Sequence, residues 1–314
     1  MTATRRQFLG GAVAAASAVA LAEESTTKRL RWQCGLGLNG FMSSESEFKK
    51  QYPLWEVLDF AANTGFDGIE LVDGWPQGPY PKPGETARMA ALKRLYDQYG
   101  LQIYTIQTAG AGVYSPDASR RKKWLEGFRG QVQLGRAFGC DFIGNWPGGG
   151  LAGNANVDEA IGNLAKGYRD AAKVCADAGM HLSFEIEPPF LFNTPEHLER
   201  ILAEVDDPAC KTNYDPSHFD LMWGSRGKPE EMLARIGVGH IGHVHLTDTD
   251  GTLFGGTSKH LACGEGHCDI PASLRCLCDG GYEGWIMIDG WKIEDVYNAA
   301  RKGIHAIDAA RERC

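Results

Sequence analysis

The chain has 314 residues, of which 43% are hydrophobic and 23% are charged, and its formal net charge is −8 at pH 7. A chain of this length and hydrophobic content can form one larger globular domain or two small ones. The acidic balance makes a nucleic-acid backbone or an anionic membrane surface an unfavourable partner. No internal stretch is long and apolar enough to cross a bilayer.

The first 22 residues have the layout of an export signal. Arg5-Arg6 precedes an Ala-rich apolar run, which ends at the small-residue site Ala20-Leu21-Ala22. This order is typical of a secretory signal, and the paired arginines indicate export by the twin-arginine machinery. We therefore expect a signal peptide at 1–22, a mature domain at 23–314 and a periplasmic or otherwise extracytoplasmic location, with no membrane attachment after cleavage. The alternative is an uncleaved anchor or a chance basic helix.

Nine cysteines are present, and an odd number argues against a fully paired disulfide framework. Several lie inside apolar runs, where a free cysteine behaves as a small core residue. Four near the C-terminus lack the spacing of a zinc site; they are Cys263, Cys268, Cys276 and Cys278. One disulfide in that region is compatible with export, but the spacing indicates no pairing.

After the N-terminal segment, apolar runs of strand length alternate with amphipathic stretches of helix length. The predicted strands are Trp32–Leu38, Phe66–Leu71, Leu101–Gln107, Cys140–Asn145, His181–Glu185, Lys211–Asp215, His240–Leu246 and Trp285–Asp289. The predicted helices are Tyr52–Thr64, a segment from Pro83 through Leu95, 118–138, Val157–Ala178, a segment opened by Thr194-Pro195, Lys228–Ile236, Ile270–Cys278 and Ile293–Arg311. Strict alternation predicts a parallel sheet, and eight units without a linker favour a single-domain closed (β/α)8 TIM barrel.

A doubly wound open sheet is the alternative architecture. It would place a glycine-rich phosphate loop directly after the first strand, at the start of a helix. The glycine-rich segment 35–40 lacks the dinucleotide-binding spacing, and we expect no helix to follow it at once. Both points favour the barrel.

Potential metal ligands occur at the ends of four consecutive predicted strands. They are Glu185, Asp215, His245 and Asp289. The carboxyl ends of barrel strands meet at one mouth, where catalytic residues lie in barrels of this type. Three carboxylates and an imidazole suit a hard or borderline divalent cation, with Mn²⁺ or Mg²⁺ ahead of Zn²⁺. Taken singly, each acid could instead cap the turn that follows its strand.

Pro216 removes a backbone donor directly after Asp215, so Asp215 is expected to be the last residue of its strand. His218 is then expected to lie in the loop beyond it. Glu187 follows Glu185 at the strand period and points to the same face. We prefer Glu185 as the ligand, because it closes the apolar run.

Five short motifs together resemble the xylose isomerase-like barrel superfamily, specifically its sugar phosphate isomerase/epimerase branch. They are Gly179–Glu185, Asp215–His218, His243–Asp248, Gly264–Gly266 and Gly281–Trp285. The resemblance covers essentially residues 30–312. It implies one divalent metal ion, with Mn²⁺ first and Mg²⁺, Co²⁺ or Zn²⁺ as alternatives, held by Glu185, Asp215, His245 and Asp289. It also implies that His218 contacts metal-bound substrate. The family usually carries Glu where this chain has Asp289, which brings its role in proton transfer into question.

A metal ion at such a site polarises a sugar carbonyl and acidifies the neighbouring C–H. Glu185 is the first candidate base, and Asp289 is the candidate for the opposing acid or base. The candidates for substrate contacts are His218, His260, Glu187, Trp146 and Trp291. For these residues the alternatives are a surface loop position for His260, plain packing for the tryptophans and a supporting position behind the ligands for Glu187.

The sequence therefore predicts a metal-dependent keto-sugar isomerase or epimerase that acts through an enediolate. Two alternatives stay open. A leaving group β to the carbonyl would make the enzyme a lyase on oxidised 3-keto glycosides, which export favours because phosphorylated sugars are scarce outside the cytoplasm. A secreted sugar-binding barrel without activity is the other. Net charge and export both argue against a DNA-repair phosphodiesterase of the same barrel type.

Overall fold

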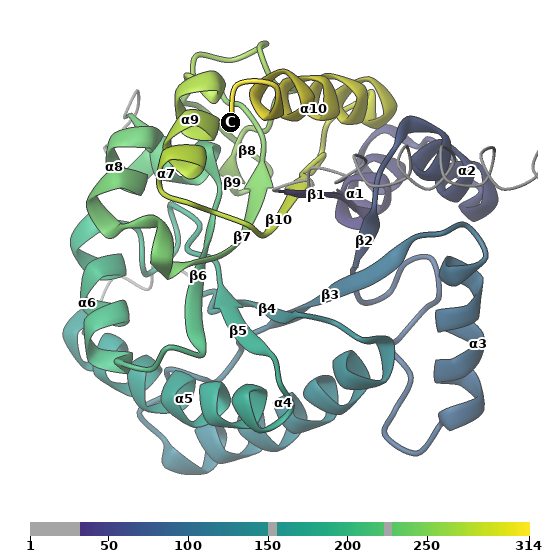
Figure 1. Cartoon of the computed structure of the whole chain (residues 1–314). Helices are drawn as coiled ribbons and strands as arrows, with labels where there is room; N and C mark the ends of the chain where they lie inside the picture. Colours follow the sequence, from purple (N-terminus) through teal and green to yellow (C-terminus); the bar gives the residue numbers. More distant parts are fainter. Residues whose placement is uncertain (1–31, 150–155, 223–227) are drawn as a thin grey trace, which may run out of the picture. The chain divides into compact units, whose positions relative to one another are not determined.

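The computed structural model describes residues 32–149, 156–222 and 228–314. The expected export signal therefore lies outside the described residues. Eight parallel strands close into a barrel in the order β1-β10-β7-β6-β5-β4-β3-β2, as Figure 1 shows. Their bounds are β1 Gln33–Gly37, β2 Gly68–Leu71, β3 Gln102–Ala109, β4 Phe142–Trp146, β5 His181–Phe184, β6 Cys210–Tyr214, β7 Ile241–Leu246 and β10 Trp285–Ile288. The predicted closed (β/α)8 barrel is confirmed.

Helices surround the barrel between successive strands (Figure 1). Their bounds are α1 Leu38–Phe48, α2 Leu54–Thr64, α3 Thr86–Asp97, α4 Ala118–Phe138, α5 Val157–Asp177, α6 Pro195–Val205, α7 Pro216–Met222, α8 Pro229–Ile236, α9 Ile270–Asp279 and α10 Val296–Arg311. A short 3-10 turn, Val238–His240, precedes β7. The order of elements matches the sequence-based order closely, and the bounds differ by a few residues.

The helix starts follow the capping residues of the sequence. Thr194 accepts a hydrogen bond from the His197 amide, and Pro195 occupies the first turn of α6. Asn156 caps α5 in the same way through the Glu159 amide. Each cap satisfies one backbone donor that the helix itself leaves without a partner. These local signals are why the helix starts could be predicted.

Two local expectations were wrong. Helix α1 begins directly after β1, at Leu38, although we expected no helix there. Its sequence carries Asn, Gly and several Ser residues, which have low helix propensity and hide the helix from pattern analysis. His218 lies in the short helix α7 rather than in a loop, because Pro216 occupies the first position of that helix instead of breaking the chain.

An insertion between β7 and α9 forms a small antiparallel hairpin. Its strands are β8 Leu253–Phe254 and β9 Thr257–Ser258, joined by Gly255-Gly256. Strands of two residues carry no readable alternation, so the sequence did not reveal them. The hairpin lies outside the barrel sheet and brings Gly255, Gly256 and Thr257 to the lining of the mouth cavity described below.

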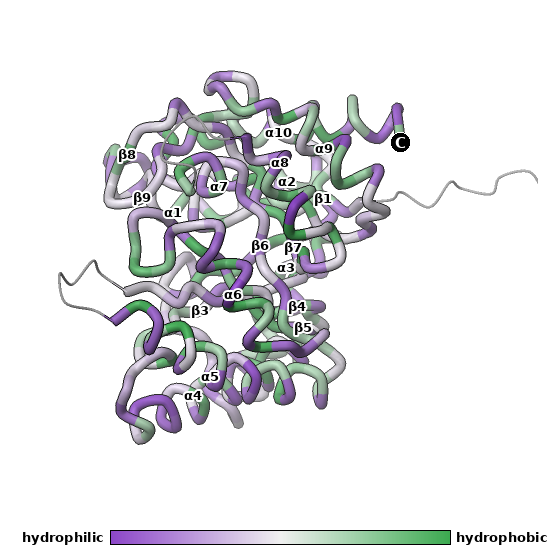
Figure 2. Tube along the Cα trace, turned by 90° about the vertical axis from the view of Figure 1, so that its left-hand side faces the viewer, coloured by the Kyte–Doolittle hydropathy of each residue, from purple (hydrophilic) through white to green (hydrophobic). Residues whose placement is uncertain are grey.

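The main core lies between the strands and the surrounding helices, and a second cluster fills the barrel interior. In the interior, the rings of Tyr104 and Trp285 stack with centroids 4.1 Å apart. Gly68 leaves room for this stack, since a Cβ there would lie 2.7 Å from the Trp285 ring. Hydrophilic and hydrophobic residues alternate along α4 and α5, as expected for helices that bury one face (Figure 2).

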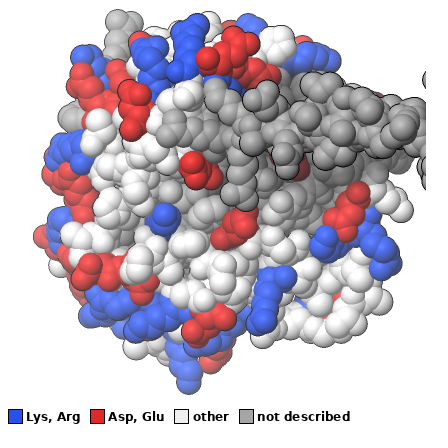
Figure 3. Space-filling view, viewed as in Figure 1, with Lys and Arg blue, Asp and Glu red and all other residues white. Residues whose placement is uncertain are grey.

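The surface charges are mixed. On the face shown in Figure 3, Lys and Arg side chains are interspersed with Asp and Glu around the rim. No described helix is long and apolar enough to span a membrane. Cys278 at the end of α9 forms a disulfide with Cys314 beyond α10. Cys278 is one of the four cysteines discussed above, but the sequence did not indicate Cys314 as its partner.

The interior stack gives a stability prediction. Gly68→Ala should lower the free energy of unfolding by about 1–3 kcal/mol, because the added methyl group meets a rigid ring and a backbone carbonyl. Gly127→Ala in α4 is the matched control, since nothing lies within 4 Å of its added Cβ. The control should be neutral or stabilising by up to about 1 kcal/mol. Denaturant unfolding of both variants measures the difference, and equal stabilities would contradict the interior packing.

Candidate metal centre at the barrel mouth

Three carboxylates stand at the same height on the barrel rim. Glu185, Asp215 and Asp289 each occupy the position directly after a strand, β5, β6 and β10 respectively. His245 projects from the neighbouring β7, and all four side chains are buried. Because parallel strands end at one rim, residues far apart in the chain converge. The ligand atoms of Glu185, Asp215 and His245 lie within 4.8 Å of one another, and Asp289 Oδ2 lies 3.6 Å from His245 Nδ1.

Glu70, in the middle of β2, orients the imidazole of His245. Its Oε2 lies 3.0 Å from His245 Nε2, while His245 Nδ1 lies 3.0 Å from Glu185 Oε1. Burial opposes ionisation of Glu70, but the imidazoles of His245 and His243 outweigh it and lower the pKa of this carboxyl. An ionised Glu70 accepts the Nε2 proton, so Nδ1 is left to face the rim carboxylates. This is how a ligating histidine is usually held by a carboxylate behind it.

The donor atoms fit a divalent cation. Asp215 Oδ1 accepts a hydrogen bond from the Ser217 amide at 2.7 Å, so the expected capping contact is present. Its second oxygen, Oδ2, is buried without a hydrogen-bond partner among the described residues. Burial, Glu185 and Asp289 raise the pKa of Asp215 well above its usual range. Unpartnered buried donors of this kind are what a carboxylate and imidazole metal site requires.

Neighbouring groups fix both oxygens of Glu185 and one oxygen of Asp289. Asn213 donates to Glu185 Oε1 at 2.6 Å, and the indole N–H of Trp146 donates to Glu185 Oε2. Asp289 Oδ1 accepts two hydrogen bonds, one from the Asn39 side-chain amide at 3.0 Å and one from the Trp291 backbone amide at 2.8 Å. That arrangement turns Asp289 Oδ2 towards His245.

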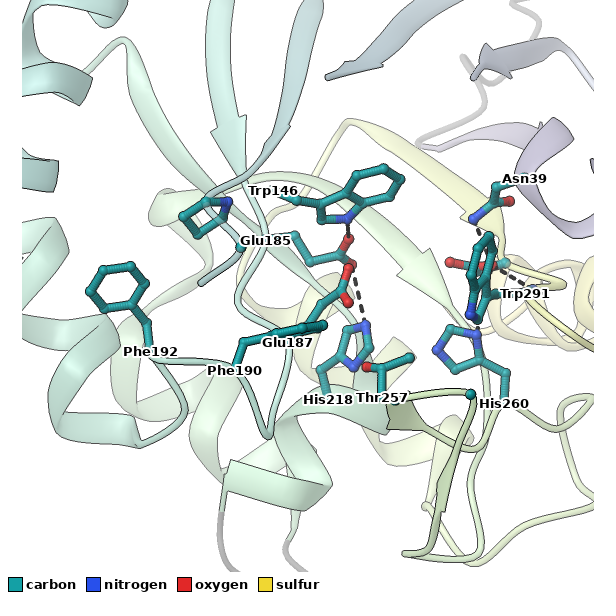
Figure 4. Close-up of a pocket in the computed structure, with 15 residues that line it drawn as sticks. Asn39, Trp146, Glu185, Glu187, Phe190, Phe192, His218, Thr257, His260 and Trp291 are labelled. Atoms are coloured by element: carbon teal, nitrogen blue, oxygen red, sulfur yellow. Dashed lines mark hydrogen bonds and ion pairs between the residues drawn. The ribbon is translucent and has the colours of Figure 1, made fainter. Parts of the chain in front are cut away.

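A cavity of about 260 Å³ opens above these groups. Figure 4 shows Trp146 and Glu187 beside Glu185, with Asn39, Trp291 and His260 on the opposite side. Its lining residues are Asn39, Trp146, Pro147, Gly148, Glu185, Glu187, Phe190, Phe192, His218, Gly255, Gly256, Thr257, His260, Asp289 and Trp291. Asp215 and His245 are not among these lining residues.

Two neutral histidines lie on one side of the cavity. His218 Nδ1 lies 2.9 Å from Ser258 Oγ, and its Nε2 lies 3.8 Å from Asp215 Oδ2. Burial lowers the pKa of His218 to about 3 and also lowers that of His260. Both ring nitrogens of His260 are buried without a hydrogen-bond partner among the described residues. The alternative of an exposed loop position for His260 is therefore wrong.

Glu187 presents its carboxyl to the same cavity. Burial raises its pKa well above the usual range, and the charges of Glu185 and Asp289 add to that effect. One of its oxygens and the ligand atoms of Glu185 and His218 lie within 4.8 Å of one another. The site thus holds two neighbouring carboxyls whose pKa values are shifted in opposite directions, as acid–base chemistry requires.

The structure brings all nine sequence-derived candidates to one end of the barrel. Sequence reasoning missed Glu70, His243, Asn39 and Asn213, which hold the rim residues in place. Glu70 had a readable signal, since it is an acid inside an otherwise apolar strand. His243 Nε2 lies 3.0 Å from His245 Nε2 on the same strand, and its Nδ1 lies 2.9 Å from Ser183 Oγ on β5, a contact that depends on the fold.

The fold and these side chains define a TIM barrel with a candidate divalent-metal centre at its mouth. The chain belongs to the xylose isomerase-like TIM barrel family, which it matches over residues 58–310. It is 24% identical over 297 residues to inosose dehydratase from Klebsiella pneumoniae subsp. pneumoniae, covering 86% of this chain and 91% of that protein.

Solved structures share the fold. The IolI protein with a bound zinc atom superposes with a TM-score of 0.71 at 16% identity, over 88% of this chain and 99% of that one. An L-ribulose 3-epimerase superposes with a TM-score of 0.69 at 18% identity, over 90% and 96%. The relatives thus include both an epimerase and a dehydratase.

The contact behind His245 gives a prediction about metal affinity. Glu70→Gln should weaken metal binding by about 10–100-fold, because a neutral amide no longer fixes the imidazole with Nδ1 free. Glu283→Gln, at an exposed position, is the control and should bind metal as the wild type does. Titration of the metal-free proteins with Mn²⁺ and with Zn²⁺ measures both. Unchanged affinity in Glu70→Gln would contradict the orienting role.

Metal binding should also release protons. The carboxylates Glu185 and Glu70 outweigh burial and raise the pKa of His245, and burial raises that of Asp215, so both groups hold protons more tightly than usual without metal. A cation can bind only after these protons leave, and its apparent affinity should therefore rise with pH. Calorimetric titrations in buffers of different ionisation enthalpy count the released protons. A count of zero near pH 7 would contradict this charge arrangement.

Proposed function

We propose that the protein is a divalent-metal-dependent isomerase or epimerase of a keto sugar, with Mn²⁺ as the first candidate ion. The observation that carries the proposal is the position of Glu185, whose carboxylate lines the cavity while it lies beside His245 Nδ1. The other proposed ligands are Asp215, His245 and Asp289. We propose further that the protein acts outside the cytoplasm, which the Arg5-Arg6 signal supports.

The bound cation would polarise the carbonyl of a chelated hydroxy-ketone and acidify the adjacent C–H. Glu185 then removes that proton, because neighbouring groups, with His245 first, overcome its burial and lower its pKa, so that it stays ionised. His218 and His260 are neutral and can donate hydrogen bonds to substrate oxygens. Return of the proton to the neighbouring carbon completes isomerisation, and return to the opposite face completes epimerisation.

The dimensions of the cavity support a small polar substrate. A volume of about 260 Å³ lies near the lower end of ligand sites, which suits a single sugar ring. Trp146 and Trp291 line the cavity and offer faces on which a ring can stack. The net charge of −8 and the mixed rim charges fit an uncharged or weakly charged sugar better than a polyphosphate.

A second candidate is β-elimination, which a specific pair of observations favours. An inosose dehydratase is similar over 86% of this chain, and burial raises the pKa of Glu187, the carboxyl that lies next to the base. Glu185 would take the proton beside the carbonyl, the C–O bond at the β carbon would break, and Glu187 would give its proton to the departing oxygen. The products are an unsaturated ketone and an alcohol or water. A sugar-binding barrel without turnover is the remaining alternative.

Solvent deuterium incorporation tests the shared first step. The metal-loaded protein in D₂O should exchange the proton next to the carbonyl in one or more of a panel of keto sugars and 3-keto glycosides, followed by NMR. Glu185→Gln should lower the exchange rate by roughly 10²–10⁴-fold even at saturating metal. Asp289→Asn should lose rate only as metal occupancy falls, if Asp289 is a ligand alone. A large loss at full occupancy would instead make Asp289 an acid–base group and favour epimerisation.

Glu187→Gln separates the two candidate reactions. It should leave deuterium exchange largely intact, but should slow release of the leaving group if elimination is the reaction. An absence of exchange with every sugar, together with stoichiometric metal, would support the sugar-binding alternative and would overturn the proposed chemistry.

A further inference from the structure

A second, larger hollow adjoins the catalytic cavity. This cleft has a volume of about 910 Å³ and is lined by the ends of β2 and β3, the loops after them and one face of α4. Trp146 lines both spaces. Its indole N–H also donates to Glu185, so the same side chain borders the cleft and contacts the proposed base.

Aromatic side chains lie at the border between the cavity and the cleft. Tyr114 lines the cleft and packs edge-on against Phe192, which lines the cavity, with ring centroids 5.5 Å apart. On the far wall of the cleft, Trp124 stacks on Phe128 at 5.1 Å. A ligand at the metal centre that extends past Trp146 would therefore enter a space with flat apolar walls.

The two volumes differ in what they can hold. The cavity at the metal centre suits one sugar ring, whereas the cleft lies near the upper end of the range for small-molecule sites. A free monosaccharide would leave the cleft unused. The geometry is that of a site for a two-part ligand, with the sugar at the metal centre and a larger substituent beyond Trp146.

Three polar groups that line the cleft have partners within the protein. Asp73 accepts from the Tyr80 amide at 2.8 Å, Thr108 donates to Gly144 O at 2.7 Å, and Ser115 accepts from the Asp117 amide. These three groups are engaged by the protein itself, whereas the aromatic side chains of the lining offer faces for stacking. The aromatic walls favour an aromatic substituent, and another sugar is the alternative that the test below includes.

Gln107 differs from these three groups. Its side chain is 2% exposed and lines the cleft, and neither its amide nitrogen nor its amide oxygen has a hydrogen-bond partner among the described residues. Gly144 makes room for the amide, since a Cβ there would overlap Gln107 Oε1. A buried amide without partners is costly, but both of its polar atoms are closed off from solvent, so a ligand in the cleft would reach them only after the side chain turns.

Two cations add a charge preference. Arg120 and Lys123 of α4 line the cleft, and neither forms a salt bridge with any residue in the described ranges. The sole acid in the lining is Asp73, and its Oδ1 is engaged by the Tyr80 amide. An anionic or phenolic group at the outer end of the substituent would complement these cations.

We propose that this cleft is a subsite for an aromatic aglycone with an acidic or phenolic group, and that the substrate is an oxidised aryl glycoside rather than a free sugar. The placement of the sugar at the metal centre rests on the proposed function of that centre. In the elimination reaction, the group in the cleft is the one that departs as the alcohol. A reaction that oxidises a glycoside hydroxyl to a ketone must then supply the substrate.

Ligand binding to the metal-loaded protein tests the subsite. The probes are 4-carboxyphenyl β-D-glucopyranoside, phenyl β-D-glucopyranoside, methyl β-D-glucopyranoside and cellobiose, measured by calorimetry. We expect both aryl glucosides to bind about tenfold or more tightly than the methyl glucoside, with the carboxylated one the tighter. Gly127→Leu places a side chain into the cleft from a position with nothing within 4 Å of its Cβ, and should remove the aryl preference.

Gly162→Leu on α5 is the matched control, because its added Cβ meets only Glu204 Oε2 at 3.8 Å and lies away from the cleft. It should keep the aryl preference, and both variants should keep the deuterium exchange of small keto sugars. Replacing both Arg120 and Lys123 by Met should remove only the tighter binding of the carboxylated glucoside. The preference for aryl over methyl glucosides should remain.

Equal binding of all probes, an undiminished aryl preference in Gly127→Leu, or cellobiose binding as tightly as the aryl glucosides would overturn the subsite. Deuterium exchange would persist in those cases, and the proposed function would stand. Conversely, an aryl preference lost in Gly127→Leu, without exchange in any sugar, would leave the subsite standing and overturn the proposed chemistry.

Discussion

The mouth of the barrel is governed by the repulsion among buried carboxylates. Glu185, Asp215 and Asp289 converge on one imidazole, with Glu70 behind it. Acids this close cannot all ionise in a buried site unless positive charge compensates them. None of the described residues that line the cavity is Lys or Arg. The charge balance therefore depends on protons or on a bound cation, and this dependence links metal, pH and catalysis.

The rest of the barrel keeps those groups apart by defined distances. Each rim acid follows its strand by one residue, so the strand ends set the spacing, and the turns after β6 and β10 hold Asp215 and Asp289 through the Ser217 and Trp291 amides. Amides from Asn39 and Asn213 then fix one oxygen of Asp289 and of Glu185. Such supporting contacts hold a site closer to its working geometry than long flexible side chains could.

The barrel could be predicted from sequence because its determinants are local. Each strand is an apolar run, and caps such as Thr194 mark the helix starts. Once the strands close, the proximity of Glu185, Asp215 and His245 follows from strand order. Glu70 and Gln107 were not predicted as site residues, because their importance depends on which strand lies opposite. The cleft depends on where α4 packs, which no periodicity encodes. The start of α1 could not be predicted, because the residues of this helix have weak helix propensity.

The hairpin after β7 separates ligand selectivity from folding stability, two properties that are usually coupled in a protein. It is bonded to itself through Leu253–Ser258 and is anchored by the Asp248–Leu261 bridge, outside the barrel sheet. Yet it supplies Thr257 to the cavity and Ser258 to His218. Sequence drift at its tip, where Leu253 and Phe254 are exposed, can therefore reshape ligand selectivity while the barrel keeps its folding stability. Lineages that share this barrel can diverge in substrate through a segment of about a dozen residues.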